Sequence, residues 1–310
     1  MKYKKILVQA LLLLILVGGT AAVLFRQGPV DTAKPEVFNA DTAMLAIFGT
    51  YNEKQHGVLL PEKNTRNWDM KEADTLATAL LTATYTEGGQ KKAVLAVQRQ
   101  QILDGVVEEN HATAAQISVY IFAHDGRQWV FEKGKKEVAT AGSHGSAPGS
   151  RLIRLGQDKY GLLFEGGDVH QGYTNDYAFL IALSDTKPGK VLDLDTGGSN
   201  SGTCSDDPAE QGDSGMRACW ERTSKISFVQ KDNDDYFVLK LSTISNEGAD
   251  DKRNKKKTEQ YYVRTDSGYK LSKDGSLKNA RPVADEIVYH AGETQLLADT
   301  IPAMPRTVVK

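Results

Sequence analysis

Short runs of β-branched, aromatic and aliphatic residues alternate with polar turns along most of the chain after residue 74. Two such runs joined by a short turn are typical of a β-hairpin. The recurrence of this pattern predicts a mainly β fold, in which antiparallel hairpins form a sandwich or a meander. The predicted pairs are 75–86 with 92–100, 117–123 with 128–132, 152–155 with 160–165, 225–230 with 236–244, and 260–264 with 269–272.

Two segments depart from this alternation. Residues 177–183 (YAFLIAL) are apolar in both phases of a strand period, which predicts a strand with both faces covered. Near residues 41–52 the spacing of Met44, Leu45 and Phe48 instead fits one face of a helix. We expect one short helix there with Asp41 as its N-cap, because an aspartate side chain accepts a hydrogen bond from the first turn.

The N-terminus is the longest uncharged stretch of the chain. Residues 6–25 carry no charged side chain, and Lys2, Lys4 and Lys5 precede them. Twenty helical residues span about 30 Å, the thickness of a bilayer's hydrocarbon core. The same segment has the basic, apolar and small-residue regions of a secretory signal. Residues 1–26 are therefore predicted to be a signal anchor, which is a transmembrane helix, or a cleaved signal peptide.

Either interpretation of the N-terminus exports the rest of the chain. We expect a cell-envelope protein in the bacterial inner membrane, facing the periplasm, or a periplasmic protein if the segment is cleaved. Residues 27–40 contain two prolines and are predicted to be a linker. Residues 41–140 and 150–305 then form N-terminal and C-terminal mainly β regions, as two domains or as one.

Charge and cysteine content narrow the possible functions. The 38 Lys and Arg residues stand against 40 Asp and Glu, so the chain lacks the basic surplus that nucleic-acid binding needs. In an oxidising compartment the two cysteines, Cys204 and Cys219, are expected to form a disulfide. Closing a loop of about 15 residues contributes about 3 kcal/mol to stability in the chain-entropy model. A metal site at the cysteines lacks the necessary nearby histidines.

The segment Leu192–Asn200 (LDLDTGGSN) contains an Asp-Thr-Gly motif. It resembles the catalytic loop of pepsin-like aspartic proteases, which implies that Asp195 is one carboxylate of a dyad that shares a proton. The chain departs from that family in three ways. Asp193 interrupts the apolar approach, and the second triplet, Asp213–Gly215, follows only 18 residues later. No convincing hydrophobic-hydrophobic-Gly segment follows to cross the active loop. Because these residue types also build turns, we expect solvated turn carboxylates here.

The histidines suggest another candidate site. Asp168 and His170 flank a valine, and His144 lies in the Gly/Ser-rich stretch 141–150. If the sheet brings His144, Asp168 and His170 together, they can act as acid and base or hold a divalent metal ion. Asp193 and Asp195, together with Asp206 and Asp207, also suggest a looser cation site, although the spacing of an EF-hand is not met.

These patterns favour a non-enzymatic binding or assembly module of the cell envelope. The sequence has no nucleophile elbow, phosphate-binding loop or dinucleotide fingerprint, so no cofactor is expected, with a divalent metal as the one alternative. The expected partner is an envelope protein, a glycan or a small ligand, and residues 6–25 contact the membrane. Trp129, Tyr160 and Tyr173 are candidate contact residues. The alternative is an exported hydrolase, either metal-assisted at His144, Asp168 and His170 or of the aspartyl type at Asp195.

Overall fold

The computed structural model describes residues 37–60, 70, 73–205, 217–232, 234–247 and 255–283. These residues belong to one compact unit, Val37–Lys310. The predicted membrane or signal segment, residues 1–26, lies outside the described residues. Within the described part of the chain, no helix combines the length and the apolar character needed to cross a bilayer.

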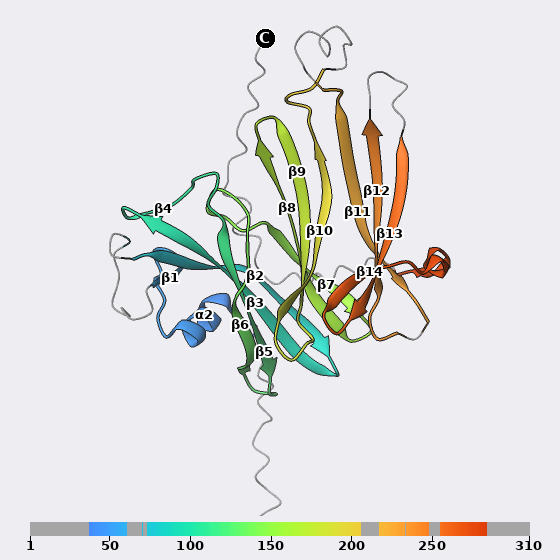
Figure 1. Cartoon of the computed structure of the whole chain (residues 1–310). Coiled ribbons are helices and arrows are strands. Elements are labelled where there is room, and N and C mark those ends of the chain that lie inside the picture. The colour runs from blue at the N-terminus through green and yellow to red at the C-terminus, as the bar shows by residue number, and fades with distance from the viewer. Residues whose placement is uncertain are drawn as a thin grey trace, which may run out of the picture. The chain divides into compact units, whose positions relative to one another are not determined.

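The described chain is mainly β and its strands pair antiparallel, which confirms the predicted fold class at that level. The first sheet has the order β1-β2-β3-β5-β6, with β4 paired to β3, and the second runs from β7 to β14 in chain order, with β15 paired to β11 (Figure 1). The strands of the first sheet are β1 (Gly57–Leu60), β2 (Thr75–Glu87), β3 (Gln90–Leu103), β4 (Val106–Val107), β5 (Ala115–His124) and β6 (Trp129–Ala141). Those of the second are β7 (Gly149–Gly156), β8 (Lys159–His170), β9 (Tyr173–Ala182), β10 (Gly189–Ser199), β11 (Trp220–Gln230), β12 (Val238–Glu247), β13 (Lys256–Thr265), β14 (Gly268–Ser272) and β15 (Arg281–Pro282), and a short 3-10 helix, η2 (Gly275–Asn279), precedes β15.

All five predicted hairpins are present. The turn between β2 and β3 explains why the local sequence is sufficient to specify them. Glu87 pairs with Gln90 across two glycines, Gly88 and Gly89, whose φ angles are 57° and 76°. Both positions of this tight turn require left-handed backbone, which glycine adopts without steric cost.

The predicted short helix is also present, as α2 (Ala40–Phe48), but its N-cap is Asn39 and not Asp41. The side chain of Asn39 accepts a hydrogen bond of 2.8 Å from the backbone N–H of Thr42. Asp41 therefore lies inside the first turn, where its negative charge interacts favourably with the positive end of the helix dipole. Its carboxylate accepts a hydrogen bond of 2.6 Å from the hydroxyl of Tyr51.

Three of the five hydrophobic clusters among the described residues are large, and they hold the sheets together. The helix-side core lies between α2 and one face of the first sheet and includes Met44, Val58, Leu95 and Phe122. The central core joins the other face of the first sheet to β7, β8 and β9. The C-terminal core lies on the opposite face of β7, β8 and β9 and also contains residues of β10, β12 and β14.

The second half of strand β9 therefore has both faces buried, as the sequence of residues 177–183 predicted. Phe179 and Ile181 belong to the central core, whereas Ala178 and Leu180 belong to the C-terminal core. Strand β8 has the same two-sided character.

The second sheet curls so that the beginning of β12 meets the end of β7. The backbone N–H of Phe237 donates a hydrogen bond of 2.7 Å to the carbonyl of Leu155. Gly156 allows this approach, because a Cβ atom there would lie 1.9 Å from the carbonyl oxygen of Asp235. The curl brings Tyr236 close to the connection between β9 and β10, where a pocket lies.

Candidate functional site

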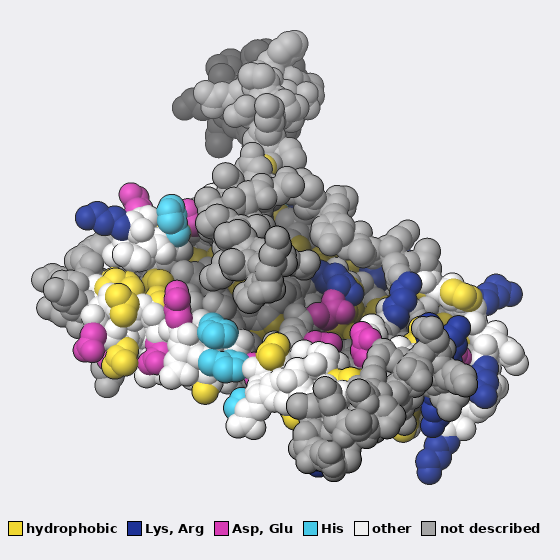
Figure 2. Space-filling model, turned by 90° about the horizontal axis from the view of Figure 1, so that it is seen from above, with side chains coloured by type: hydrophobic (Ala, Val, Ile, Leu, Met, Phe, Trp, Pro, Cys, Tyr) yellow, Lys and Arg dark blue, Asp and Glu magenta, His cyan; other side chains and the backbone are white. Residues whose placement is uncertain are grey.

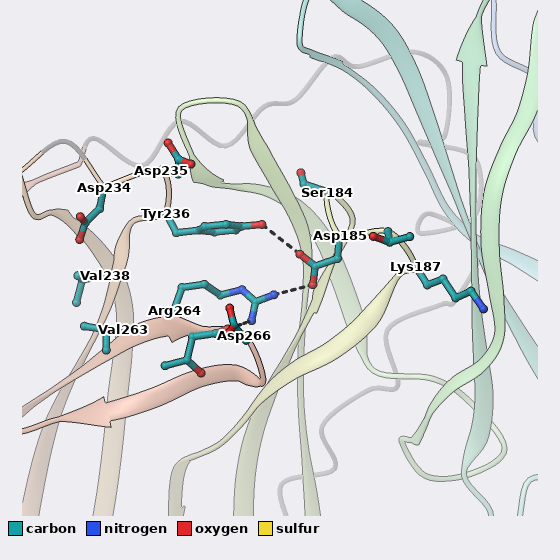
Figure 3. A pocket seen from close by; sticks show the side chains of 12 residues that line it. Ser184, Asp185, Lys187, Asp234, Asp235, Tyr236, Val238, Val263, Arg264 and Asp266 are labelled. Atoms are coloured by element: carbon teal, nitrogen blue, oxygen red, sulfur yellow. Dashed lines mark hydrogen bonds and ion pairs between the residues drawn. The ribbon is translucent and has the colours of Figure 1, made fainter.

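A pocket of about 800 Å³ opens between three segments of the curled second sheet (Figure 3). They are the β9–β10 connection, the approach to β12, and the β13–β14 hairpin. The lining residues are Ser184, Asp185, Thr186, Lys187, Asp234, Asp235, Tyr236, Val238, Val263, Arg264, Thr265 and Asp266. We call it the Asp185 pocket.

Asp185 is the centre of the polar contacts in this pocket. Its carboxylate accepts a hydrogen bond of 3.1 Å from the hydroxyl of Tyr236 and one of 2.6 Å from Nη2 of Arg264 (Figure 3). The side chains of Asp185 and Arg264 are only 30% and 12% exposed, so solvent screens their ion pair less than it would a surface pair. The three side chains fix one another in place.

Tyr236 is held as a neutral hydrogen-bond donor. Burial raises the pKa of its hydroxyl, and the negative charge of Asp185 raises it further. The guanidinium of Arg264 lies 5.3 Å from the centre of the Tyr236 ring, and Nζ of Lys159 lies 5.8 Å from it. Cations at such distances are attracted to the ring face, so these contacts orient the ring as well as the hydroxyl.

The remaining charges make the pocket acidic. Arg264 neutralises Asp185. Among the remaining lining residues there are three exposed carboxylates, those of Asp234, Asp235 and Asp266, and one cation, Lys187. A wall with an excess of one charge raises the local concentration of ligands with the opposite charge. The pocket is therefore suited to a ligand with positively charged and hydrogen-bonding groups.

A partly buried polar network connects the β9–β10 connection to the first sheet. Lys92 pairs with Glu87 at 2.8 Å and with Glu132 at 3.0 Å, and Glu87 also accepts a hydrogen bond from Ser184. Lys133 donates a hydrogen bond of 2.7 Å to the backbone carbonyl of Asp185. The position of Asp185 thus depends on residues of β2, β3 and β6.

The charges of this network shift one another's pKa values. Burial alone would raise the pKa of Glu87, but the hydrogen bonds from Lys92 and Ser184 prevail and lower it below its ordinary value. Burial likewise opposes the charge of Lys92, yet its two glutamate partners raise the pKa of the amine. Burial and the nearby Lys92 lower the pKa of Lys133.

We expect Glu87→Gln to destabilise the protein at neutral pH, by about 1–3 kcal/mol for a disrupted buried hydrogen bond to a charge. Because the folded-state pKa of Glu87 is depressed, its contribution is fully present above the unfolded value near 4.5 and is lost as pH falls through the folded value. The difference between wild type and variant should therefore shrink as pH falls below about 4.5. Urea unfolding at several pH values measures it.

Glu165→Gln is the control for this prediction. Glu165 pairs with Arg151 in a contact whose side chains are 45% and 35% exposed. Removing an exposed pair changes stability by about 0–1 kcal/mol. A Glu87→Gln variant as stable as wild type at pH 7 would contradict the assigned role of the network.

The structure brings together the predicted residues His144, Asp168 and His170, and adds His111. The ring centre of His111 lies 5.0 Å from that of His144 and 6.3 Å from that of His170. Nδ1 of His111 lies 3.5 Å from Oδ1 of Asp168. Among the described residues, no three or more His, Cys, Asp or Glu side chains are placed so that together they could hold a metal ion.

The predicted aspartates at 193 and 195 lie in strand β10, not in a loop, and form separate ion pairs. Asp193 pairs with Lys190 at 2.9 Å, and Asp195 pairs with Arg222 at 2.5 Å. The second triplet of the protease-like pattern, Asp213–Gly215, lies outside the described residues. The alternation of Leu192 and Leu194, both buried, with these exposed aspartates is the period of a strand with one covered face.

The three aromatic contact candidates differ in exposure. Tyr160 is 8% exposed and packs on Tyr85 in the central core, with ring centres 4.7 Å apart. Trp129 packs against Phe38 at 5.3 Å. Tyr173, at the start of β9, is 38% exposed and is the one of the three with a substantial free surface.

The predicted disulfide is present between Cys204 and Cys219. A second pocket, of about 470 Å³, adjoins it and is lined by Ala218, Cys219, Trp220, Glu221, Arg222, Ser245 and Asn246. Comparison of the chain with protein families, with curated proteins and with solved structures found no match.

Proposed function

We propose that this chain is an exported, membrane-anchored envelope protein that acts as a non-enzymatic binding or assembly module, with the Asp185 pocket as its ligand site. Its scaffold, in this proposal, is a sandwich of two antiparallel meanders. The observation that carries the proposal is the mutual fixing of Asp185, Tyr236 and Arg264 in one pocket. A few convergent polar groups in a preformed pocket are typical of ligand sites.

The charge of the pocket specifies the ligand's chemistry. Three exposed carboxylates favour ammonium groups, while hydroxyl and amide groups of the ligand can hydrogen-bond to the backbone and side chains of the lining segments. Amino sugars, polyamines and lysine side chains of envelope proteins share this chemistry. The uncharged stretch 6–25 supports attachment to the membrane in which such ligands are encountered.

The test is capture of envelope components by the full chain in detergent, analysed by mass spectrometry and carbohydrate analysis. The pocket variant combines Asp234→Asn, Asp235→Asn and Asp266→Asn. We expect it to retain about tenfold less ligand than wild type, because three exposed charge contacts of about 0.5 kcal/mol each are lost. The capture should also weaken in 1 M salt, where the screening length falls to about 3 Å.

A matched control removes the same charge elsewhere on the surface. Asp104→Asn, Asp158→Asn and Asp193→Asn also neutralise three exposed aspartates, none of which lines the pocket. This variant should retain ligand as wild type does. Equal capture by the pocket variant and wild type would refute the assignment of the ligand to this pocket.

The alternative function, an exported hydrolase, has one observation in its favour. His144, Asp168 and His170 come together on one surface, as the metal-assisted form of that hypothesis requires. The aspartyl form needs a second carboxylate beside Asp195. In the structure Asp195 instead forms an ion pair with Arg222. We therefore place the hydrolase second, and its metal-assisted form requires an ion at the histidines.

A further inference from the structure

Four metal-ligating side chains meet on one exposed face, and they come from three separate segments. His111 lies between β4 and β5, His144 lies between β6 and β7, and Asp168 and His170 stand at the end of β8. Histidine side chains gather on this face in Figure 2. We call this group the histidine cluster. It shares no residue with the Asp185 pocket.

Backbone carbonyls fix which nitrogen of two of these rings carries a proton. Nε2 of His111 lies 2.9 Å from the carbonyl oxygen of Val169, and Nδ1 of His144 lies 3.2 Å from that of Glu109. A carbonyl oxygen only accepts, so both of these nitrogens donate. In the neutral rings, Nδ1 of His111 and Nε2 of His144 are then left as lone-pair donors. Metal-binding histidines are characteristically oriented in this way by a second hydrogen bond.

One free nitrogen already faces a carboxylate. Nδ1 of His111 and Oδ1 of Asp168 are 3.5 Å apart. With a neutral ring this places two acceptors opposite each other, and either a proton on Nδ1 or a metal cation between the two atoms relieves the repulsion. Oδ1 of Asp168 also accepts a hydrogen bond of 2.8 Å from the backbone N–H of Val169. Two ligands of one tetrahedral zinc ion, each about 2.1 Å from it, are themselves about 3.4 Å apart. The observed separation fits that value.

The spacing of the rings is compatible with the same ion. Two imidazoles on one tetrahedral zinc have ring centres about 5 Å apart, given the metal–nitrogen distance of about 2.1 Å. The rings of His111 and His144 are 5.0 Å apart but stacked, with an angle of 11° between their planes, and His170 is 6.3 Å from His111. An ion lies near the plane of each imidazole that binds it, so one of the stacked rings has to rotate before both can bind the same ion. All four side chains of the cluster are exposed, so His170 can approach by side-chain rotation.

We propose that His111, His144, Asp168 and His170 bind one divalent transition-metal ion of the zinc class. As the side chains stand, no three of them could hold an ion together, so binding requires the exposed His144 and His170 to rotate toward the pair formed by His111 and Asp168. Imidazole and carboxylate are ligands that zinc accepts readily. Such a site ties the end of β8 to the β4–β5 connection and to the β6–β7 connection that joins the two sheets.

Gly145 holds the two loops of the cluster close together. Its backbone N–H donates a hydrogen bond of 2.8 Å to the carbonyl of Thr113, and its φ angle is +71°. A Cβ atom at this position would lie 2.1 Å from the carbonyl oxygen of Glu108. Gly145→Ala therefore separates His144 from His111 without removing a ligand, and we expect it to weaken binding.

The test is isothermal titration of zinc chloride into the full chain in detergent, purified without a histidine tag. Wild type should bind one ion per chain. His111→Asn, His144→Asn and His170→Asn should each weaken binding at least tenfold, and the triple variant should abolish it. Lowering the pH to 5.5 should also weaken binding, because zinc requires deprotonated ligands.

His56→Asn is the matched control, because His56 is exposed and, like His144, has left-handed backbone, with φ angles of 46° and 52°. It should bind zinc as wild type does. Circular dichroism verifies that every variant is folded. Wild-type binding no tighter than that of the folded triple variant, or equal losses in the His56 control, would overturn the proposal. These outcomes are independent of ligand capture by the Asp185 pocket.

Discussion

Truncation of Phe164 to alanine is expected to lower the free energy of unfolding by about 3–5 kcal/mol. Phe164 is fully buried in the central core and stacks on Phe179, with ring centres 4.6 Å apart. Its strand, β8, lies between two cores, so the neighbouring side chains have little freedom to fill the space left by the ring. A cavity that cannot collapse gives the upper part of this range.

Urea unfolding followed by tryptophan fluorescence or circular dichroism measures the effect. Leu271→Ala provides the control, since Leu271 is 53% exposed and its truncation should change stability by no more than about 0.5 kcal/mol. A loss below about 1 kcal/mol for Phe164→Ala would mean that the central core is not the packed interface described above.

Replacing both Cys204 and Cys219 by serine is expected to cost about 3 kcal/mol of stability. The two residues are separated by 15 positions, so the disulfide restricts a loop of moderate length in the unfolded chain. In the folded chain the same ends are already held by Asn200, which is fully buried. Its side chain donates a hydrogen bond of 2.9 Å to the carbonyl of Ala218 and accepts one of 2.7 Å from the N–H of Trp220.

Reduction separates the effect of the crosslink from that of the serine side chains. Wild type in dithiothreitol should unfold at the same urea concentration as the double variant, and dithiothreitol should not affect the variant. Because Asn200 holds the folded ends without the crosslink, the reduced protein should keep its native circular dichroism spectrum. Identical stability of the oxidised and reduced wild type would refute a stabilising role for the bridge.

Local sequence was sufficient for the hairpins because their turns are locally determined. The glycine pair at 88–89 and the polar turns elsewhere specify where a strand reverses, and the runs beside them then pair in register. The two-phase apolar run in β9 likewise predicted burial on both faces. The N-cap was misplaced by two residues because Asn39 and Asp41 are both good caps, and local composition does not choose between them.

The sequence did not predict strand β10, because the Asp-Thr-Gly motif within it was interpreted as a turn or a catalytic loop. The sequence Leu-Asp-Leu-Asp at 192–195 has the alternation of a strand, but the following Thr-Gly-Gly favoured a turn or a catalytic loop. The buried Leu192 and Leu194 show that the period of two was the better signal. In β10 the backbone of Gly197 and Gly198 continues the ladder beside β11.

The two candidate sites differ in how far sequence could anticipate them. His144, Asp168 and His170 were grouped by residue type, but His111 could join them only through the packing of connections far apart in the chain. The Asp185 pocket had no local signal at all. Asp185 is 51 residues from Tyr236 and 79 from Arg264, and the curl of the second sheet, which depends on contacts between distant strands, brings them together.

The position of β7, β8 and β9 between two cores limits how this protein can be divided. A fragment that ends at residue 148 would leave Val94, Ile117 and Ile121 without the wall that covers them. A fragment that begins at residue 149 would expose the face of β7, β8 and β9 that packs on the first sheet. The smallest fragment that contains the first sheet and keeps its central core covered therefore extends through β9. Such a fragment also contains about half of the buried residues of the C-terminal core.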